Sequence, residues 1–202
     1  MKALLAFILI AMFIVQPVLP KLTYAIPPLP PLNTPFAGVV VLNVTIDSTG
    51  NVRNISTVAG ASPFLKASFD AVKQWKFTTA RDLNGERLVS VIFLYRPRQI
   101  FSSGSGMQLP ERHSAAQPAL PTLISDASYP VNSVAEGVVI LELKVSADGA
   151  IEQIKTIRDV PSLTDVDRKA VETWTFSPAV AAGRAVEGTS IAAISFLRPI
   201  IQ

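Results

Sequence analysis

The sequence of 202 residues contains no cysteine and a single histidine, His113. The absence of cysteine excludes disulfide bonds, thiolate metal sites and cysteine nucleophiles, so packing alone must stabilise the fold. A catalytic triad would have to recruit His113, which lies in a stretch rich in Pro, Ser and Gly. We therefore expect no enzyme, no catalytic residues, no metal site and no cofactor.

Charged residues are also scarce, at 16% of the chain, with 18 Lys and Arg against 15 Asp and Glu. Nucleic-acid-binding chains usually carry basic clusters interleaved with aromatic residues, and this sequence has none. A nucleic-acid partner is therefore not expected.

The longest hydrophobic run lies at the N-terminus. Lys2 precedes an unbroken apolar stretch over residues 3–15, which is shorter than the roughly 20 residues of a membrane-spanning helix. Thr23-Tyr24-Ala25 then offers a small residue at a cleavage position. We interpret residues 1–25 as a signal peptide cleaved after Ala25, and an uncleaved membrane anchor is the alternative.

Two segments of biased composition divide the rest of the chain. Residues 26–34 begin with Ile-Pro-Pro-Leu-Pro-Pro, which predicts an extended spacer because proline fixes φ and lacks an N–H donor. Residues 99–121 are rich in Gly, Ser and Pro, which predicts a flexible linker. These boundaries predict a first domain over residues 35–98 and a second over residues 122–202.

The two predicted domains repeat each other. A shift of 99 residues aligns residues 38–80 with residues 137–179 without a gap. Each copy opens with Gly and alternating apolar residues, which is typical of a strand. Gly50 and Gly149 then predict hairpin turns, where a residue tolerant of positive φ is needed.

The return runs, residues 52–58 and 151–157, are short and rich in β-branched side chains. We predict strands there, although the apolar spacing of three residues would also suit a helix. A helix follows in each copy, with Ser62 and Ser162 predicted at its start. Trp75 and Trp174 end these helices and are expected to pack in the core.

A last strand closes each copy, over residues 88–95 and 190–197. Both end before an Arg-Pro dipeptide, Arg96-Pro97 and Arg198-Pro199. Proline cannot donate to the ladder, so the strand should stop there.

This order of motifs resembles the C-terminal domain of TonB. The second copy matches best, with Tyr129-Pro130, Gly137, Asp148-Gly149 and the Trp-x-Phe-x-Pro-Ala motif that begins at Trp174. The first copy lacks Tyr-Pro and has Thr49-Gly50 instead of Asp-Gly, so it looks divergent.

The resemblance implies an α+β fold of two tandem small domains, each a three-stranded antiparallel sheet with one or two helices packed on one face. It also implies a periplasmic location and binding rather than catalysis. The family's usual mode adds an extended segment of an outer-membrane transporter to an exposed sheet edge. The implied partner is therefore an envelope protein or peptide segment, and dimerisation stays open.

The closing strands are the candidate binding edges in this sequence. The candidate partner-binding residues are Val91, Phe93, Tyr95, Ile191, Ile194 and Phe196. Two alternatives remain open at this point. These side chains pack in the core, or the closing strands pair with each other across the domains and form a structural tandem with no free edge.

A TonB-type energy transducer anchored in the membrane is the other functional alternative. The apolar N-terminal run contains neither the Ser nor the His that the TonB anchor carries. The spacer would reach only roughly 30 Å in an extended form, too short to cross a periplasm. We therefore favour an exported binding module that recognises an extended peptide or an envelope protein, and membrane contact is expected only if the N-terminal run is uncleaved.

Overall fold

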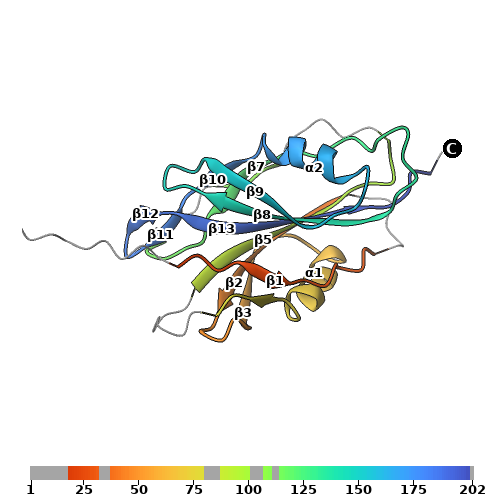
Figure 1. Ribbon diagram of the computed structural model, residues 1–202. Helices are drawn as coiled ribbons and strands as arrows, with labels where there is room; N and C mark the ends of the chain where they lie inside the picture. The colour runs from red at the N-terminus through yellow and green to blue at the C-terminus, as the bar shows by residue number, and fades with distance from the viewer. Residues whose placement is uncertain (1–17, 32–36, 80–86, 101–106, 111–113, 201–202) are drawn as a thin grey trace, which may run out of the picture.

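The computed structural model describes residues 18–31, 37–79, 87–100, 107–110 and 114–200. The predicted signal core and His113 lie outside these ranges. Two helices, α1 (Phe64–Val72) and α2 (Thr164–Val171), accompany the strands (Figure 1). The strands are β1 (Leu22–Tyr24), β2 (Gly38–Ile46), β3 (Val52–Ala59), β4 (Lys76–Phe77), β5 (Arg87–Tyr95), β6 (Met107–Gln108), β7 (Leu120–Ile124), β8 (Gly137–Val145), β9 (Ile151–Arg158), β10 (Thr175–Ser177), β11 (Ala179–Ala181), β12 (Arg184–Val186) and β13 (Gly188–Phe196).

A six-stranded sheet in the order β3-β2-β5-β13-β8-β9 is the centre of the molecule. Each repeat contributes a hairpin and its closing strand, and these three strands are antiparallel. The closing strands β5 and β13 pair with each other in parallel. The two predicted three-stranded sheets are therefore halves of one continuous sheet.

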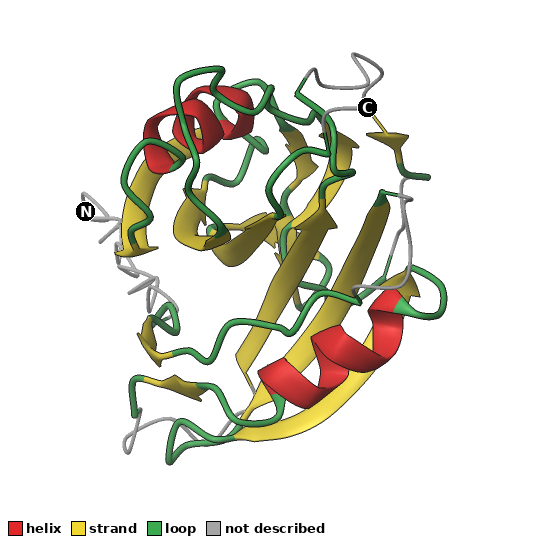
Figure 2. Cartoon of the chain, turned by 90° about the vertical axis from the view of Figure 1, so that its right-hand side faces the viewer, coloured by secondary structure: helices red, strands yellow, loops and turns green. Residues whose placement is uncertain are grey.

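The helices lie on opposite faces of this sheet (Figures 1 and 2). The equivalent strands β5 and β13 run in the same direction, and the strand order is mirrored about them. The second repeat is therefore turned over relative to the first, so its helix packs on the opposite face of the sheet. Alternation along a strand then divides the side chains between two cores. In β5, Val91 and Phe93 face the α1 core, whereas Ile92 and Leu94 face the α2 core.

Each core borrows residues from the other repeat. Val138 and Ile140 of β8 pack in the α1 core, and Val41 of β2 packs in the α2 core. The expected division into two independent domains joined by a flexible linker does not match this packing. Both repeats form one folded unit, because neither buries its sheet without the other.

The hairpins and return strands follow the sequence prediction. Gly50 and Gly149 have φ of +85° and +88°, and a Cβ on Gly149 would lie 2.3 Å from the Phe176 carbonyl oxygen. The return runs are the strands β3 and β9 despite their three-residue apolar spacing. Only glycine fits at both turns.

The predicted N-cap residues, Ser62 and Ser162, are each one position too early. Pro63 and Leu163 occupy the N-cap positions, and neither helix has a side-chain cap. The hydroxyl of Ser162 bonds instead to the hydroxyl of Ser133, at 2.5 Å. Trp75 and Trp174 are buried just beyond the helices, as predicted for core residues.

The repeat extends further upstream than the aligned residues suggest. β1 pairs with β4 and β7 pairs with β10, in registers related by the same shift of 99 residues. The first repeat therefore comprises residues 21–96 and the second residues 120–197. None of the helices in the described ranges has the length and apolar character needed to cross a bilayer.

The N-terminal segment is packed rather than extended as a free spacer. Leu22 is only 4% exposed and Pro28 is buried, and residues 26–29 and Pro31 line a groove against α1. In the predicted linker, β6 and the start of β7 form strands. Cleavage after Ala25 would remove β1 from the fold, because β1 ends at Tyr24.

A chain that begins at Ile26 should be less stable than one that begins at Val18, by about 2 kcal/mol, because it loses the burial of Leu22. Urea unfolding of the two chains measures this difference. Tyr24→Ala in the longer chain is the control, since Tyr24 is 54% exposed and should contribute little. Equal stability of the two chains would show that β1 is not part of the stable unit.

Candidate protein-interaction edges

The strands predicted to carry the binding edge lie in the middle of the sheet. β5 has β2 and β13 as neighbours, and β13 has β5 and β8. Their parallel register runs from Val89↔Thr189 to Tyr95↔Ser195. This corrects the expectation of open edges at the closing strands, because each strand uses the other's main-chain groups.

The six candidate binding side chains are all at most 2% exposed. They do not form one surface, because they divide between the two faces of the sheet. Four of them, Val91, Phe93, Tyr95 and Ile191, pack in the α1 core, and two, Ile194 and Phe196, pack in the α2 core. A partner could reach them only by separating β5 from β13.

Polar contacts add to the junction between the repeats. The hydroxyls of Ser90 and Ser190 lie 2.7 Å apart in the buried centre, and Ser90 donates to the Ala119 carbonyl at 2.5 Å. At the end of β5, Arg96 Nε donates to Asp126 Oδ1 at 2.5 Å. The Arg96 guanidinium also lies 4.7 Å from the centre of the Phe196 ring. These contacts oppose strand separation.

Among the described strands of the six-stranded sheet, β3 and β9 have a neighbour on one side only and lie at its two margins. Register shifts interrupt the pairing near both ends of each strand. Between these shifts, residues 54–57 and 153–156 keep a regular register. Bulges protect an edge from long, nonspecific pairing. The regular stretch available for a partner strand is therefore short in both repeats.

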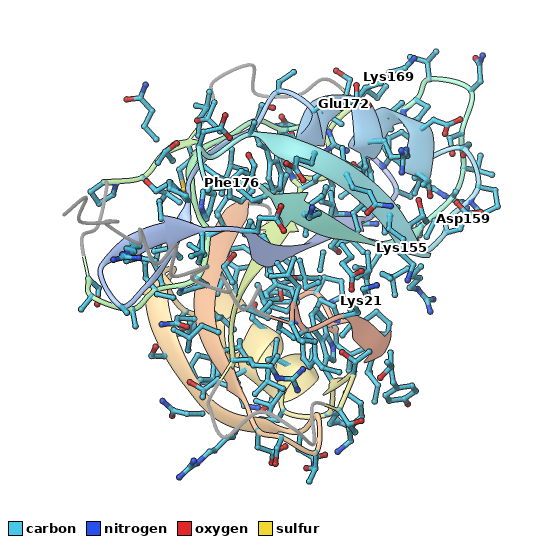
Figure 3. All side chains as sticks on the ribbon, turned by 60° about the vertical axis from the view of Figure 1, so that its left-hand side comes forward. Lys21, Lys155, Asp159, Lys169, Glu172 and Phe176 are labelled. Atoms are coloured by element: carbon cyan, nitrogen blue, oxygen red, sulfur yellow. The ribbon has the colours of Figure 1, made fainter. Side chains whose placement is uncertain are left out.

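A polar groove of about 240 Å³ borders β9. It lies between the strand and α2 and includes Ile151, Ile154, Arg168 and Glu172. Arg168 Nη1 donates to the Ile154 carbonyl at 3.0 Å. Figure 3 shows Lys155 on β9, Lys169 on α2 and Glu172 at the C-terminal end of α2. A segment added to β9 would thus meet both strand main chain and helix side chains.

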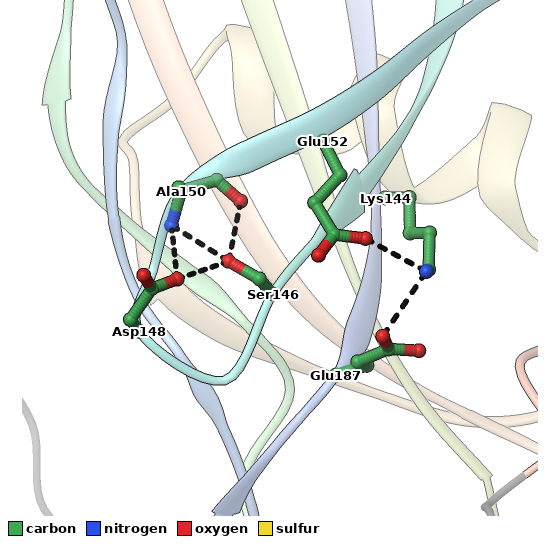
Figure 4. Close-up of polar contacts among 6 residues, drawn as sticks. All are labelled: Lys144, Ser146, Asp148, Ala150, Glu152 and Glu187. Carbon is green, nitrogen blue, oxygen red and sulfur yellow. Dashed lines mark hydrogen bonds and ion pairs between the residues drawn. The ribbon is translucent and has the colours of Figure 1, made fainter.

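The hairpin that leads into β9 is fixed by ionic and turn contacts (Figure 4). Lys144 Nζ lies 2.7 Å from Glu152 and 3.1 Å from Glu187. The hydrogen bonds that it donates to these carboxylates raise the pKa of Lys144. At the turn, Ser146 donates to Asp148.

The corresponding margin at β3 has different chemistry. The 99-residue shift places Phe69 and Lys73 of the first repeat where the second has Arg168 and Glu172. Asn54, Ser56 and Thr57 of β3 are exposed. The two edges therefore share a main-chain pattern but differ in the side chains beside them.

A buried charged cluster lies at the junction of the repeats, between β5, α2 and the segment after β7. Asp167 is 0% exposed, and neither of its carboxyl oxygens has a hydrogen-bond partner among the described residues. Burial raises its pKa well above the usual value, while Arg96 lowers it and Asp126 raises it further. The first repeat has Ser68 at this position, bonded to the Tyr95 hydroxyl at 2.9 Å.

Asp167 and Arg96 of this cluster are buried, whereas Asp126 is half-buried and borders a cavity of about 120 Å³. Among the described residues, no group of His, Asp and Glu side chains could hold a metal ion.

The comparison with known families agrees with this architecture. The family described as Gram-negative bacterial TonB protein C-terminal matches residues 36–96 and 129–197, more than half of the chain. The chain belongs to the TonB C-terminal family. Its two matched segments lie within the two repeats and omit β1 and β7. Comparisons with curated proteins and with solved structures gave no match.

Membership gives the repeats a general role. TonB C-terminal domains are protein-interaction domains of the cell envelope, and they interact with outer-membrane proteins. The 99-residue repeat, together with the hairpin and Trp-x-Phe motifs, was the sequence pattern that indicated these two domains. The motifs could not reveal the β5–β13 pairing, because both closing strands look alike whether paired or open.

Asp167→Asn should stabilise the protein at pH 7 by about 1–3 kcal/mol, because it removes a buried carboxylate without a partner. The folded pKa of Asp167 is raised, so ionisation opposes folding. The free-energy cost of ionising Asp167 is absent below the pKa of about 3.9 that an aspartate has in the unfolded chain. This cost grows as pH rises from there toward the folded-state pKa. The variant should therefore lose less stability than the parent between pH 4 and pH 7.

Urea unfolding at several pH values measures this effect. Asp165→Asn is the matched control, since Asp165 is exposed on the same helix. An unchanged pH slope for Asp167→Asn would contradict the assignment of a buried ionisation cost to this residue.

Proposed function

We propose that this protein is an exported periplasmic binding module that recognises an extended segment of an envelope protein by strand addition to β3 or β9. The observation that carries the proposal is the sheet order, in which these two strands alone have one neighbour within the six-stranded sheet. Strand addition uses main-chain hydrogen bonds for affinity and adjacent side chains for specificity.

The family supports a protein partner, and the structure supports the choice of edge. β5 and β13 are occupied by each other, whereas β3 and β9 each keep a regular stretch of four residues at a margin of the sheet. Within the β9 stretch, the Ile154 carbonyl already accepts from Arg168. A segment of that length fits a short motif in an otherwise unrelated partner. The groove between β9 and α2 adds charged side chains for selecting it.

A tandem with a purely structural role is less well supported by this arrangement. Pairing of the closing strands joins the repeats, as that alternative expects, but it leaves the two outer strands of the sheet available. Coupling to an energy-transducing motor has no described feature in its favour. Binding of an extended envelope segment is therefore the function that the geometry supports best.

Site-specific crosslinking tests the edges, because a chain without cysteine accepts single labels cleanly. A photo-crosslinker is attached to Asn54→Cys on β3 or Gln153→Cys on β9, which are equivalent and exposed. Envelope proteins of the producing bacterium are then crosslinked. We expect one short segment of a partner to be captured at one or both positions.

Lys66→Cys on α1 and Asp165→Cys on α2 are matched controls at equivalent helix positions. A synthetic copy of the captured segment should then slow amide exchange in β3 or β9 and not in the helices. Equal capture at the helix positions, or no change in amide exchange at either edge, would refute strand addition there.

A further inference from the structure

The two repeats contain equivalent grooves that each hold an extended segment. β1 lies on β4 with Leu22 opposite Phe77, and β7 lies on β10 with Pro121 opposite Phe176. In both grooves the indole N–H of a buried tryptophan donates to a carbonyl of the segment, at 2.8 Å. The groove is thus a repeated feature of the fold, and a segment of the chain occupies it in both repeats.

The first groove holds residues 21–26 mainly through their backbone. The Thr78 N–H donates to the Lys21 carbonyl at 2.8 Å, and Trp75 Nε1 donates to the Ile26 carbonyl. The Leu22 N–H donates to Glu142 Oε2 at 2.5 Å. The Leu22 side chain is buried in the α1 core. Recognition therefore needs an extended chain, one aliphatic side chain and one free N–H.

The Glu142 contact comes from the other repeat. Glu142 lies on β8, so the segment in the first groove touches both halves of the sheet. In the second groove, Pro121 stands at the position of Leu22 and has no N–H to donate. This acceptor thus distinguishes the first groove from the second.

The two occupants are held to different extents. β7 lies between β6 and β10, and just before it Ala119 accepts from Ser90 while Gln117 pairs with Val180. β1 has β4 as its strand neighbour among the described residues, and two of its three residues are exposed. β1 is therefore the occupant that can leave without opening the central sheet.

We propose that the groove over β4 is a second strand-acceptor site, in which an extended segment of a partner protein replaces residues 21–26. The partner segment carries an aliphatic residue with a free N–H in the place of Leu22. Its neighbours can be polar, because Thr23 and Tyr24 are exposed in the chain's own segment. Cleavage after Ala25, which the sequence predicts, would remove residues 21–25 and open this part of the groove for the partner, while Ile26 would remain in the chain.

This site is distinct from the edges β3 and β9 of the proposed function, because its main-chain groups belong to β4 and its acceptor carboxylate to β8. Its occupant lies against the α1 face, where Figure 1 shows β1 crossing beside α1. The two proposals can therefore fail independently.

A reversible lock on β1 tests the proposal in the full chain. Tyr24 and Lys76 are register partners, so Tyr24→Cys with Lys76→Cys allows a disulfide that holds β1 in place. The probe is a fluorescent peptide with the sequence Lys-Leu-Thr-Tyr-Ala-Ile, followed by anisotropy. We expect binding to the reduced protein and at least a tenfold weaker affinity after oxidation.

The equivalent pair in the second repeat is the matched control. Leu123→Cys with Thr175→Cys locks β7 on β10, and its oxidation should leave peptide affinity unchanged. Because the tethered β1 competes with the probe, Leu22→Ala should raise peptide affinity roughly tenfold. Equal binding to the oxidised and reduced β1 pair would overturn the proposal, as would absent binding to both the reduced pair and Leu22→Ala.

The role of Glu142 gives a second readout. A peptide with proline in place of leucine lacks the N–H and should bind at least tenfold more weakly. Glu142→Gln should reduce this discrimination, because a neutral acceptor makes a weaker hydrogen bond. Glu152→Gln is the control, since Glu152 pairs with Lys144 rather than with β1. If Glu142→Gln distinguished the leucine peptide from the proline peptide as well as the parent does, this carboxylate would not contribute to recognition of the segment.

Discussion

The parallel pairing of β5 with β13 is the constraint on which the rest of the structure depends. It joins two similar units through their last strands, and it places their helices on opposite faces. Each core then needs side chains from the other unit, so the halves fold as one. The same pairing removes the closing strands from the surface and leaves β3 and β9 at the margins.

The buried ionic cluster at the end of β5 follows from that junction. Arg96 belongs to the first repeat, but its partner Asp126 and its aromatic neighbour Phe196 belong to the second. Buried ion pairs seldom add much net stability, because desolvation offsets the attraction. They do penalise other arrangements, since separating the repeats would leave a charge without its partner. Arg96 thus favours one register of β5 against β13.

The sequence predicts the elements well because their signals are local. Alternating apolar residues, the glycines at 50 and 149, and the run before each Arg-Pro gave the strands of both repeats. The pairing of β5 with β13 was not predictable, since Val91 and Ile191 look equally apolar in an open edge and in a buried centre. The role of β1 was missed because residues 1–25 read as a signal peptide, and that of β7 because residues 99–121 read as a flexible linker; the match between residues 21–26 and 120–125 is also weak. Asp167 was overlooked because an aspartate on a helix normally faces solvent.

The direction of the outer strands has a consequence for valency. β5 and β13 run the same way, and each is separated from its outer strand by one antiparallel neighbour, so β3 and β9 also share one orientation. Two identical ligands that pair antiparallel with these strands would therefore enter the complex with the same polarity. Two such chains, one at each margin of the six-stranded sheet, would run in the same direction.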